Sequence, residues 1–213
     1  MRRLIVLEGG EGAGKSTVLK LVRQKLDEQD IPYLLTREPG GSLCAELIRD
    51  LIFSDEGKAA DALTQFCLFW AARASHLQWQ IRPALRSDCV VLSDRYDAST
   101  FAYQIAAKNG QDLASLFWTT REMFQRGMLE PLYIYLDVPP EIGLARVQSR
   151  GGKTTHFDDE KIDFHRRVAE GFSQFFQTIE ARGGRVAVVN AQLPLEAVVQ
   201  RVVTEILIEL RQP

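Results

Sequence analysis

The stretch "IVLEGGEGAGKST", residues 5–17, decides how this chain is expected to fold. Residues 9–16 fit the pattern G-x-x-x-x-G-K-S/T and stand between an apolar run and the start of a helical pattern. Glycines let successive backbone N–H groups point at a set of phosphates, and a helix that starts at Lys15 adds the positive end of its dipole. The stretch therefore predicts a loop that binds a nucleoside triphosphate between a buried strand and a helix.

The candidate ATP-binding residues are those of this loop and the first turn after it: Gly9, Gly10, Glu11, Gly12, Ala13, Gly14, Lys15, Ser16 and Thr17. Lys15 is expected to bring its charge to the β- and γ-phosphates, and it is the first candidate catalytic residue. The hydroxyl of Ser16 is expected to bind Mg²⁺. Glu11 is unexpected here, because a carboxylate in the middle of the loop repels phosphate.

Five apolar runs predict strands at 4–7, 33–36, 89–92, 132–138 and 186–189, and helical patterns fill most of the sequence between them. Strands that alternate with helices are typical of a parallel sheet, so we expect an α/β fold with helices on both faces. Residues 149–160, "SRGGKTTHFDDE", break this rhythm. They predict either an ordinary surface loop or a mobile lid.

The bulk composition is that of an ordinary globular protein. Of 213 residues, 46% are hydrophobic and 25% are charged, so we expect one domain, 1–213, with a sizeable core. A net charge of -2 gives no overall basic field, which argues against a nucleic-acid partner. We expect no membrane span, since no stretch reaches roughly 18 apolar residues. The three scattered cysteines predict no disulfide framework, and we interpret the chain as cytoplasmic.

The loop indicates a nucleotide but leaves the reaction open among three classes. A regulatory GTPase needs the patterns D-x-x-G and N-K-x-D, and this sequence contains neither. A motor ATPase needs a strand that ends in an acidic pair, whereas "YLDVPP" (135–140) has one aspartate. A small-molecule kinase needs a second pocket for its acceptor, and the sequence offers residues for one. A kinase that acts on another deoxynucleotide or deoxynucleoside, or a nucleotide-binding protein with reduced activity, remains an alternative.

Three segments supply the candidates for that second pocket. In "TREPGG" (36–41), Arg37 suits an anion, although a solvated turn arginine is an equally ordinary reading. In "LFWAARASH" (68–76), Phe69 and Arg73 share a helix face and suit a nucleobase, although taken alone they fit a core ring and a surface arginine better.

The third segment, "SDRYDASTFAYQ" (93–104), follows an apolar strand, where open α/β sheets bind ligands. Asp94 and Arg95 are therefore well placed for a role in the site. The segment also places four polar side chains on roughly one helix face: Ser99, Thr100, Tyr103 and Gln104.

Five motifs in this order carry a resemblance that spans residue 3 to about residue 195: E-G-x-E-G-A-G-K-S-T, T-R-E-P-G-G, F-x-A-A-R, D-R-Y-x-x-S-T-x-A-Y-Q and Y-L-D-V-P-P. Together they resemble the thymidylate kinase family, whose members move the γ-phosphoryl group of ATP to dTMP. The resemblance implies a P-loop kinase fold with three layers, a five-stranded parallel sheet and a short lid. It also implies ATP and Mg²⁺ as cofactors and a homodimer formed through helices, for which residues 43–80 are apolar enough.

The resemblance implies that Arg37 and Arg95 clamp the phosphate of dTMP, and Arg95 becomes the second candidate catalytic residue. Asp94 would support Mg²⁺ beside Ser16, or else Lys15. No strong general base is needed, because the acceptor is already a phosphate oxygen.

The resemblance also implies how base and sugar are read. Phe69 would stack on thymine, Arg73 would bond its exocyclic oxygen, and Thr100 and Gln104 would read its edge. Tyr103 would crowd the 2′ position of the sugar. Ser99 shares their helix face as a further substrate-binding candidate, and Glu11 would face the sugar hydroxyl of the acceptor, which explains an acid in this loop.

The family supplies the cation for the transferring phosphoryl group either from an arginine in the P-loop or from the lid. The P-loop residue here is Ala13, so we expect the lid type, with Arg150 as the third candidate catalytic residue. His156 stands where the family often has an arginine, which leaves Arg146 and Lys153 as alternatives.

Overall fold

The computed structural model describes residues 3–150 and 160–212 of the chain. Its strands are β1 (Leu4–Glu8), β2 (Tyr33–Arg37), β3 (Val90–Asp94), β4 (Leu132–Asp137) and β5 (Val186–Asn190). They form one parallel sheet in the order β2-β3-β1-β4-β5. Each strand lies within one or two residues of its predicted range, so the five strand predictions are confirmed.

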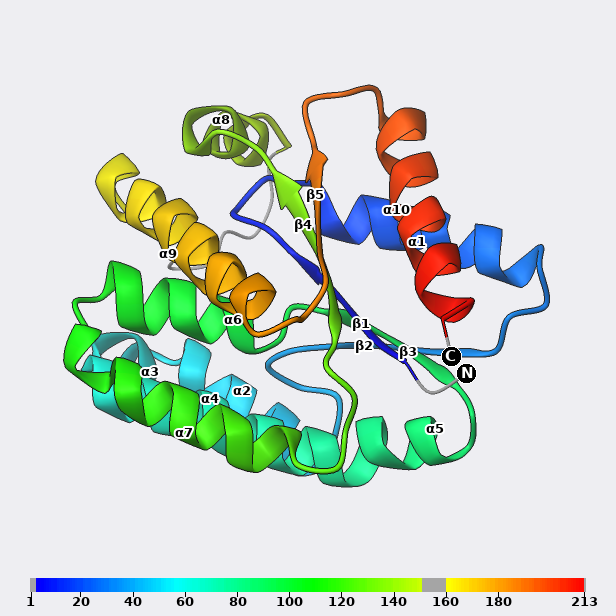
Figure 1. Cartoon of the computed structure of the whole chain (residues 1–213). Helices are drawn as coiled ribbons and strands as arrows, with labels where there is room; N and C mark the ends of the chain where they lie inside the picture. The colour runs from blue at the N-terminus through cyan, green and yellow to red at the C-terminus, as the bar shows by residue number, and fades with distance from the viewer. Residues whose placement is uncertain (1–2, 151–159, 213) are drawn as a thin grey trace.

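The helices cover both faces of this sheet (Figure 1). They are α1 (Lys15–Asp27), α2 (Leu43–Phe53), α3 (Asp55–Ala59), α4 (Ala62–His76), the π-helix η1 (Leu77–Ile81), α5 (Arg82–Arg86), α6 (Asp97–Thr100), the π-helix η2 (Phe101–Ala107), the 3-10 helix η3 (Gln111–Leu113), α7 (Ala114–Gln125), α8 (Pro140–Arg150), α9 (Ile162–Ala181) and α10 (Leu195–Leu210).

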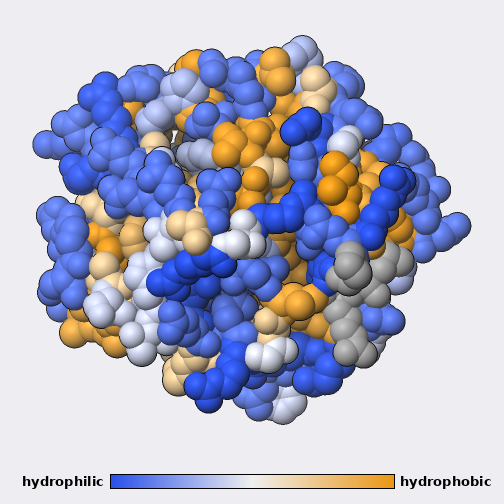
Figure 2. Space-filling view, in the orientation of Figure 1, coloured by the Kyte–Doolittle hydropathy of each residue, from blue (hydrophilic) through white to orange (hydrophobic). Residues whose placement is uncertain are grey.

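The side chains of β1 point to alternate faces of the sheet, which explains why the central strands appear in the sequence as unbroken apolar runs. Ile5 and Leu7 belong to the core beneath α1 and α10, whereas Leu4 and Val6 belong to the core beneath α4, α7 and α9. Since both faces of the strand are buried, every position is apolar until the strand ends at Glu8. The prediction of a three-layer α/β fold is confirmed, and hydrophilic residues predominate on the surface seen in Figure 2, with apolar ones in separate patches.

The helical region 98–127 differs in detail from a plain α-helix. Over η2 the hydrogen bonds step by five residues, as from Lys108 N–H to the carbonyl of Tyr103 at 3.1 Å. Helix α9 lies directly against η2 at Gly171, where an added Cβ would come within 2.6 Å of Ala106. The absence of a side chain at Gly171 therefore decides how closely α9 supports η2.

No helix among residues 3–150 and 160–212 is long and apolar enough to cross a membrane. Helix α8 leads toward the predicted lid and α9 begins after it (Figure 1). Residues 151–159 of that lid, with Lys153 and His156, lie outside the described residues. The roles predicted for the lid and for Arg150 therefore stay predictions.

Candidate active site

The candidate site lies where the carboxyl ends of β1, β2 and β3 meet the helices that follow them, the usual place for a ligand in an open α/β sheet. A cavity of about 260 Å³ opens there. Of the predicted site residues, it is lined by Glu11, Gly12, Ala13, Gly14, Lys15, Ser16, Thr17, Arg37, Phe69, Asp94, Arg95, Ser99, Tyr103 and Gln104. The loop after β1 and the acceptor candidates thus face one space.

The loop between β1 and α1 has the geometry of an anion site. Gly12 and Gly14 take left-handed backbone angles, with φ of +70° and +89°, which a side chain would disfavour. Helix α1 starts without a side-chain cap and without an acid in its first turn, so its N–H groups remain available to a ligand. The Lys15 ammonium lies beneath the loop and donates to the carbonyls of Gly9 at 2.9 Å and Gly10 at 3.0 Å.

Helix α8 packs on the outer side of this loop through two glycines. A Cβ added to Gly12 would lie 1.9 Å from the carbonyl oxygen of Gly143, and one added to Gly143 would lie 2.2 Å from that of Glu11. The backbones of the loop and of α8 are thus in direct contact. We call this the Gly12–Gly143 contact.

Glu11 is held by two groups of the acceptor side. Arg95 donates to its carboxylate at 2.9 Å, and the Tyr103 hydroxyl donates to the same oxygen at 2.8 Å. Burial by itself would raise the pKa of Glu11, but the charges of Arg95 and Lys15 outweigh burial and lower it. Glu11 is therefore an anion paired with Arg95, and its carboxylate is turned toward the acceptor candidates.

Arg95 joins three parts of the site. Its Nη1 donates to the Gly9 carbonyl at 3.1 Å and to the Ser99 hydroxyl at 3.0 Å. The guanidinium also lies over the Tyr103 ring, 5.3 Å from the ring centre. Because Arg95 bridges the loop after β1 and the helix after β3, it fixes the distance between the donor and acceptor sides.

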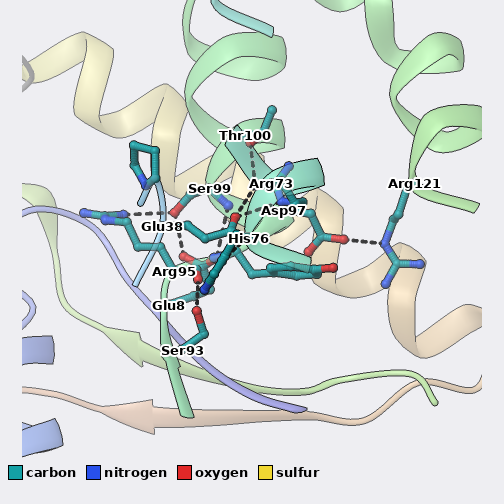
Figure 3. Close-up of polar contacts among 12 residues, drawn as sticks. Glu8, Glu38, Arg73, His76, Ser93, Arg95, Asp97, Ser99, Thr100 and Arg121 are labelled. Carbon is teal, nitrogen blue, oxygen red and sulfur yellow. Dashed lines mark hydrogen bonds and ion pairs between the residues drawn. The ribbon is translucent and has the colours of Figure 1, made fainter. Parts of the chain in front are cut away.

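Glu8 was not singled out in the sequence, yet it organises the turn that carries Arg95 (Figure 3). It is fully buried at the end of β1. Its carboxyl group accepts from the Tyr96 N–H at 2.8 Å and from the Ser99 hydroxyl at 2.7 Å. Burial raises the pKa of Glu8 to about 7, although Arg95 opposes the shift. The signal in the sequence was an acid that ends an apolar strand.

The two residues predicted to read the base lie at different depths. Phe69 is half-buried and lines the cavity. Arg73 is only 1% exposed, forms an ion pair with Glu38 at 2.7 Å and donates to the Thr100 hydroxyl at 3.1 Å. Arg73 and Thr100 thus stand behind the cavity lining, whereas Gln104 belongs to it. The interpretation of Arg73 as a surface arginine is wrong.

Several cavity residues were missed in the sequence, above all Arg49 and Phe53 of α2. The Arg49 guanidinium lies 4.8 Å from the centre of the Phe53 ring and donates to the Pro39 carbonyl at 2.7 Å. They are four residues apart on one helix face, the same spacing that indicated Phe69 and Arg73. Arg37, by contrast, was predicted and lines the cavity, with an ion pair to Glu46 at 2.8 Å.

Two oxygen donors for a cation face the same cavity. Ser16 lies at the start of α1, and Asp94 ends β3 with its buried Oδ1 unpartnered among the residues that the structure describes. Hydroxyl and carboxylate oxygens suit Mg²⁺, which is normally held by one or two protein groups together with phosphates and water. No cluster of three or more His, Cys, Asp or Glu side chains forms a metal site within residues 3–150 and 160–212.

A second cavity, of about 380 Å³, lies on the other side of the same loop. Gly12 to Gly14 form one wall, Arg146 and Val147 of α8 another, and the chain after β5 the third, with Leu193 at its edge. Arg146 is tied across this space by a 3.0 Å hydrogen bond to the Ala191 carbonyl. A flat apolar group that continues from the loop would fit here beside a guanidinium.

The fold and the loop between two cavities define this chain as a P-loop protein of the kinase type. A family model described as thymidylate kinase matches residues 7–202. The chain belongs to the thymidylate kinase family.

Relatives agree over nearly the full length. The chain is 37% identical over 200 residues to a thymidylate kinase of Clostridium novyi (strain NT), covering 93% of this chain and 95% of the relative. It is 40% identical over 205 residues to one of Lactobacillus acidophilus, covering 95% and 92%. The crystal structure of thymidylate kinase from Ehrlichia chaffeensis superposes with a TM-score of 0.71 at 26% identity, covering 96% of this chain and 98% of that one.

Proposed function

We propose that this chain transfers the γ-phosphoryl group of ATP to the phosphate of dTMP, releasing ADP and dTDP. The observation that carries this proposal is the placement of the loop, which has a cavity with several charged side chains on one side and a mainly apolar cavity with an arginine on the other. If each cavity holds one nucleotide, a phosphoryl group bound by Lys15 between the two cavities can be transferred from the donor nucleotide to the acceptor nucleotide. We propose that the chain does this as one catalytic domain in the cytoplasm, where ATP is available.

The donor side would use the backbone of residues 9–17 for the phosphates of ATP, and Lys15 would exchange its two carbonyl partners for phosphate oxygens. The adenosine would extend into the second cavity beside Arg146. Ser16 and Asp94 would hold Mg²⁺, which when bound neutralises charge on the β- and γ-phosphates.

The acceptor side would hold the dTMP phosphate among three arginines that face one cavity: Arg37, Arg49 and Arg95. They offset the repulsion between two anionic nucleotides, so the reacting oxygen can approach the γ-phosphorus. That oxygen already carries charge, and no general base has to remove a proton from it. The Glu11 carboxylate, paired with Arg95, would instead accept a hydrogen bond from a sugar hydroxyl.

The base would lie between Phe69 and Gln104. Gln104 donates to Gln65 at 3.3 Å, while its own Oε1 is buried and has no partner in the described part of the chain. A buried acceptor of this kind suits the N–H of a pyrimidine ring. Tyr103, next to Glu11, would close the space at the 2′ position of the sugar.

The further cation that meets the developing charge would come from the lid, because the loop has Ala13 where part of the family has an arginine. We propose Arg150, at the end of α8, for this role. Arg150→Ala should then lower kcat with little change in the KM for dTMP, and unchanged kcat would remove Arg150 from the mechanism.

We also propose that the chain forms a homodimer through α2 and α4. Leu43, Leu47 and Leu51 recur every four residues on α2 and are 90%, 71% and 47% exposed, and Leu63 of α4 is 48% exposed. A second copy of the same surface would remove this apolar stripe from water.

A panel of acceptors tests the proposed reaction. ADP release should be measured with dTMP, dUMP, dCMP, dGMP, AMP and thymidine, each with ATP and Mg²⁺. Turnover should be highest with dTMP, and Lys15→Ala should lower it roughly 10²–10³-fold, while Lys20→Ala on the exposed face of α1 should leave it unchanged. Turnover with thymidine and none with dTMP would identify a nucleoside kinase instead.

A further inference from the structure

Four side chains form a continuous row at the base end of the cavity: Glu38, which lines the cavity, His76 and Arg73 are buried, and Thr36 is partly buried. His76 Nε2 lies 2.7 Å from the Thr36 hydroxyl, and His76 Nδ1 lies 3.1 Å from Oε1 of Glu38. The other oxygen of Glu38 accepts from Nε of Arg73 at 2.8 Å. Figure 3 shows Glu38, His76 and Arg73 gathered together, with Thr100 at the outer end. We call Thr36, His76, Glu38 and Arg73 the base relay.

The chemistry of the base relay fixes its hydrogen bonds. A carboxylate can only accept, so Nδ1 of His76 donates to Glu38. The backbone of Glu38 is itself tied to the sheet, because its N–H donates to the Asp94 carbonyl at 2.9 Å. The carboxylate therefore has one position, set by β3 on one side and by the imidazole of His76 on the other.

This carboxylate determines the orientation of Arg73. Nε and Nη2 of the guanidinium both contact Oε2 of Glu38, and the ring centres of Trp70 and Tyr96 lie 4.5 Å and 5.0 Å from its central carbon. Nη1 is left as a buried donor without a partner among residues 3–150 and 160–212. Buried donors are nearly always hydrogen-bonded in a working protein, so this one indicates an acceptor that arrives with a ligand.

We propose that His76 and Glu38 are positioning residues for base selection, holding Arg73 so that its Nη1 meets a carbonyl oxygen on the pyrimidine ring. This inference rests on the proposed function and specifies how its base is chosen. A C4 oxygen, as in thymine, accepts from Nη1, whereas the C4 amino group of cytosine presents a donor against a donor. His76 is fully buried and does not line the cavity, whereas Glu38 does, so His76 can act on the site through Glu38.

The loop after β2 packs so closely on His76 that it restricts the position of the imidazole. A Cβ added to Gly41, which has φ of +86°, would lie 2.4 Å from Nε2 of His76 and 2.7 Å from the Thr36 hydroxyl. The loop thus closes directly over the base relay. The imidazole of His76 therefore has no room to move toward this loop.

The test compares His76→Leu with His76→Gln, using kcat and KM for dTMP and for dCMP at saturating ATP, together with Tm. Leucine removes the donor to Glu38, and we expect KM for dTMP to rise about tenfold with kcat within about twofold of wild type. The ratio of kcat/KM for dTMP to that for dCMP should fall by a similar factor. Glutamine keeps an N–H that can reach the carboxylate and should restore most of the ratio.

The matched control is Glu209→Gln, which breaks an ion pair with Arg185 at the opposite end of the sheet. Glu209 is as buried as Glu38, at 6% exposed each. This variant should lower Tm and leave the dTMP/dCMP ratio unchanged. If His76→Leu likewise lowers Tm alone, or lowers kcat/KM equally for both nucleotides, the positioning role is overturned.

Two further outcomes are decisive. Should His76→Leu fail to fold, Thr36→Val, which removes only the hydroxyl at the far end of the base relay, decides the question by the same ratio. A wild-type protein that turns over neither nucleotide overturns the proposed function and the base relay with it. Wild-type turnover of dTMP with an unchanged ratio in the variants overturns the base relay alone.

Discussion

Tyr103 serves the core and the candidate site with different parts of one side chain. Its ring meets Phe164 and Phe172 edge-on, with centres 6.1 Å and 6.2 Å apart, while its hydroxyl donates to Glu11. The ring contacts belong to the core and the hydroxyl contact to the candidate site, while the predicted role at the 2′ position of the sugar stays a prediction. Two substitutions separate them.

Tyr103→Phe keeps the ring and removes the hydroxyl, whereas Tyr103→Ala removes both. We expect Tyr103→Phe to keep the preference for dTMP over ribothymidine monophosphate and to lose about 1 kcal/mol of binding through Glu11. Tyr103→Ala should narrow the preference and lower the unfolding free energy by about 3–5 kcal/mol. Values of kcat/KM for both substrates, measured beside melting curves, check this. An unchanged preference in Tyr103→Ala would assign the ring to stability only.

The raised pKa of Glu8 predicts that the stability of the protein depends on pH through this one residue. Burial raises its pKa from 4.5 to about 7, so between these values the folded protein binds a proton that the unfolded chain has released. The free energy of unfolding therefore falls as pH rises through this range, and the loss is complete above about 7. Glu8→Gln stays uncharged at every pH. The difference between its unfolding free energy and that of the wild type should therefore increase in favour of the variant by roughly 1–3 kcal/mol from pH 5 to pH 8.

Urea unfolding of both proteins at pH 5 and pH 8 measures this difference. Other titrating groups are common to both proteins and cancel in the comparison. Parallel pH dependence of wild type and Glu8→Gln would mean that Glu8 is ionised throughout the range.

At the scale of elements, η2 is the helix whose position matters most to the acceptor cavity, because it carries Tyr103 and Gln104. It is held from outside by α9, through the bare backbone at Gly171 and through Arg167, which donates to the Ala107 carbonyl at 3.2 Å. The shape of the cavity is thus set partly by a helix that does not line it.

Gly171→Ala tests that support. The new Cβ would lie 2.6 Å from Cβ of Ala106 and 2.8 Å from Cα of Ala102, so η2 and α9 must separate. We expect a loss of about 1–3 kcal/mol in unfolding free energy and a higher KM for dTMP at nearly constant kcat. Glu170→Ala, on the exposed side of the same helix, should change neither. Lower stability with a normal KM would show that η2 holds its place without close contact from α9.

The helices and strands also show which features of the fold can be predicted from the sequence and which cannot. The strands were predictable because both faces of a strand such as β1 are apolar, with Val6 on one face and Leu7 on the other, and the local sequence shows this as an unbroken apolar run. The π-helical step at η2 was not, because a helical apolar pattern does not distinguish a π-helix from an α-helix. Phe69 and Arg73 were rightly placed on one helix face, yet the burial of Arg73 depends on Glu38, a partner that helical spacing says nothing about.

For the whole molecule, the apolar stripe on α2 predicts the state of association. Leu47→Glu places a charge at the middle of the stripe, and we expect a shift from dimer to monomer in sedimentation velocity. Ile208→Glu, at a 43% exposed position of α10, which covers the other face of the sheet, is the matched control and should leave the dimer intact. A wild-type protein that sediments as a monomer would contradict the proposed homodimer.

The Gly12–Gly143 contact has a consequence for the gene that encodes this chain. Every amino acid that a glycine codon reaches by one base change carries a Cβ, and at either position that atom would meet a main-chain oxygen of the opposing segment. Nor can a side-chain change at the opposing residue, Gly143 or Glu11, relieve the clash, because the atom that is met is a main-chain oxygen, which every residue carries. A defect at Gly143 therefore has no suppressor within the pair. Revertants must restore glycine itself or arise at positions that move α8 as a body.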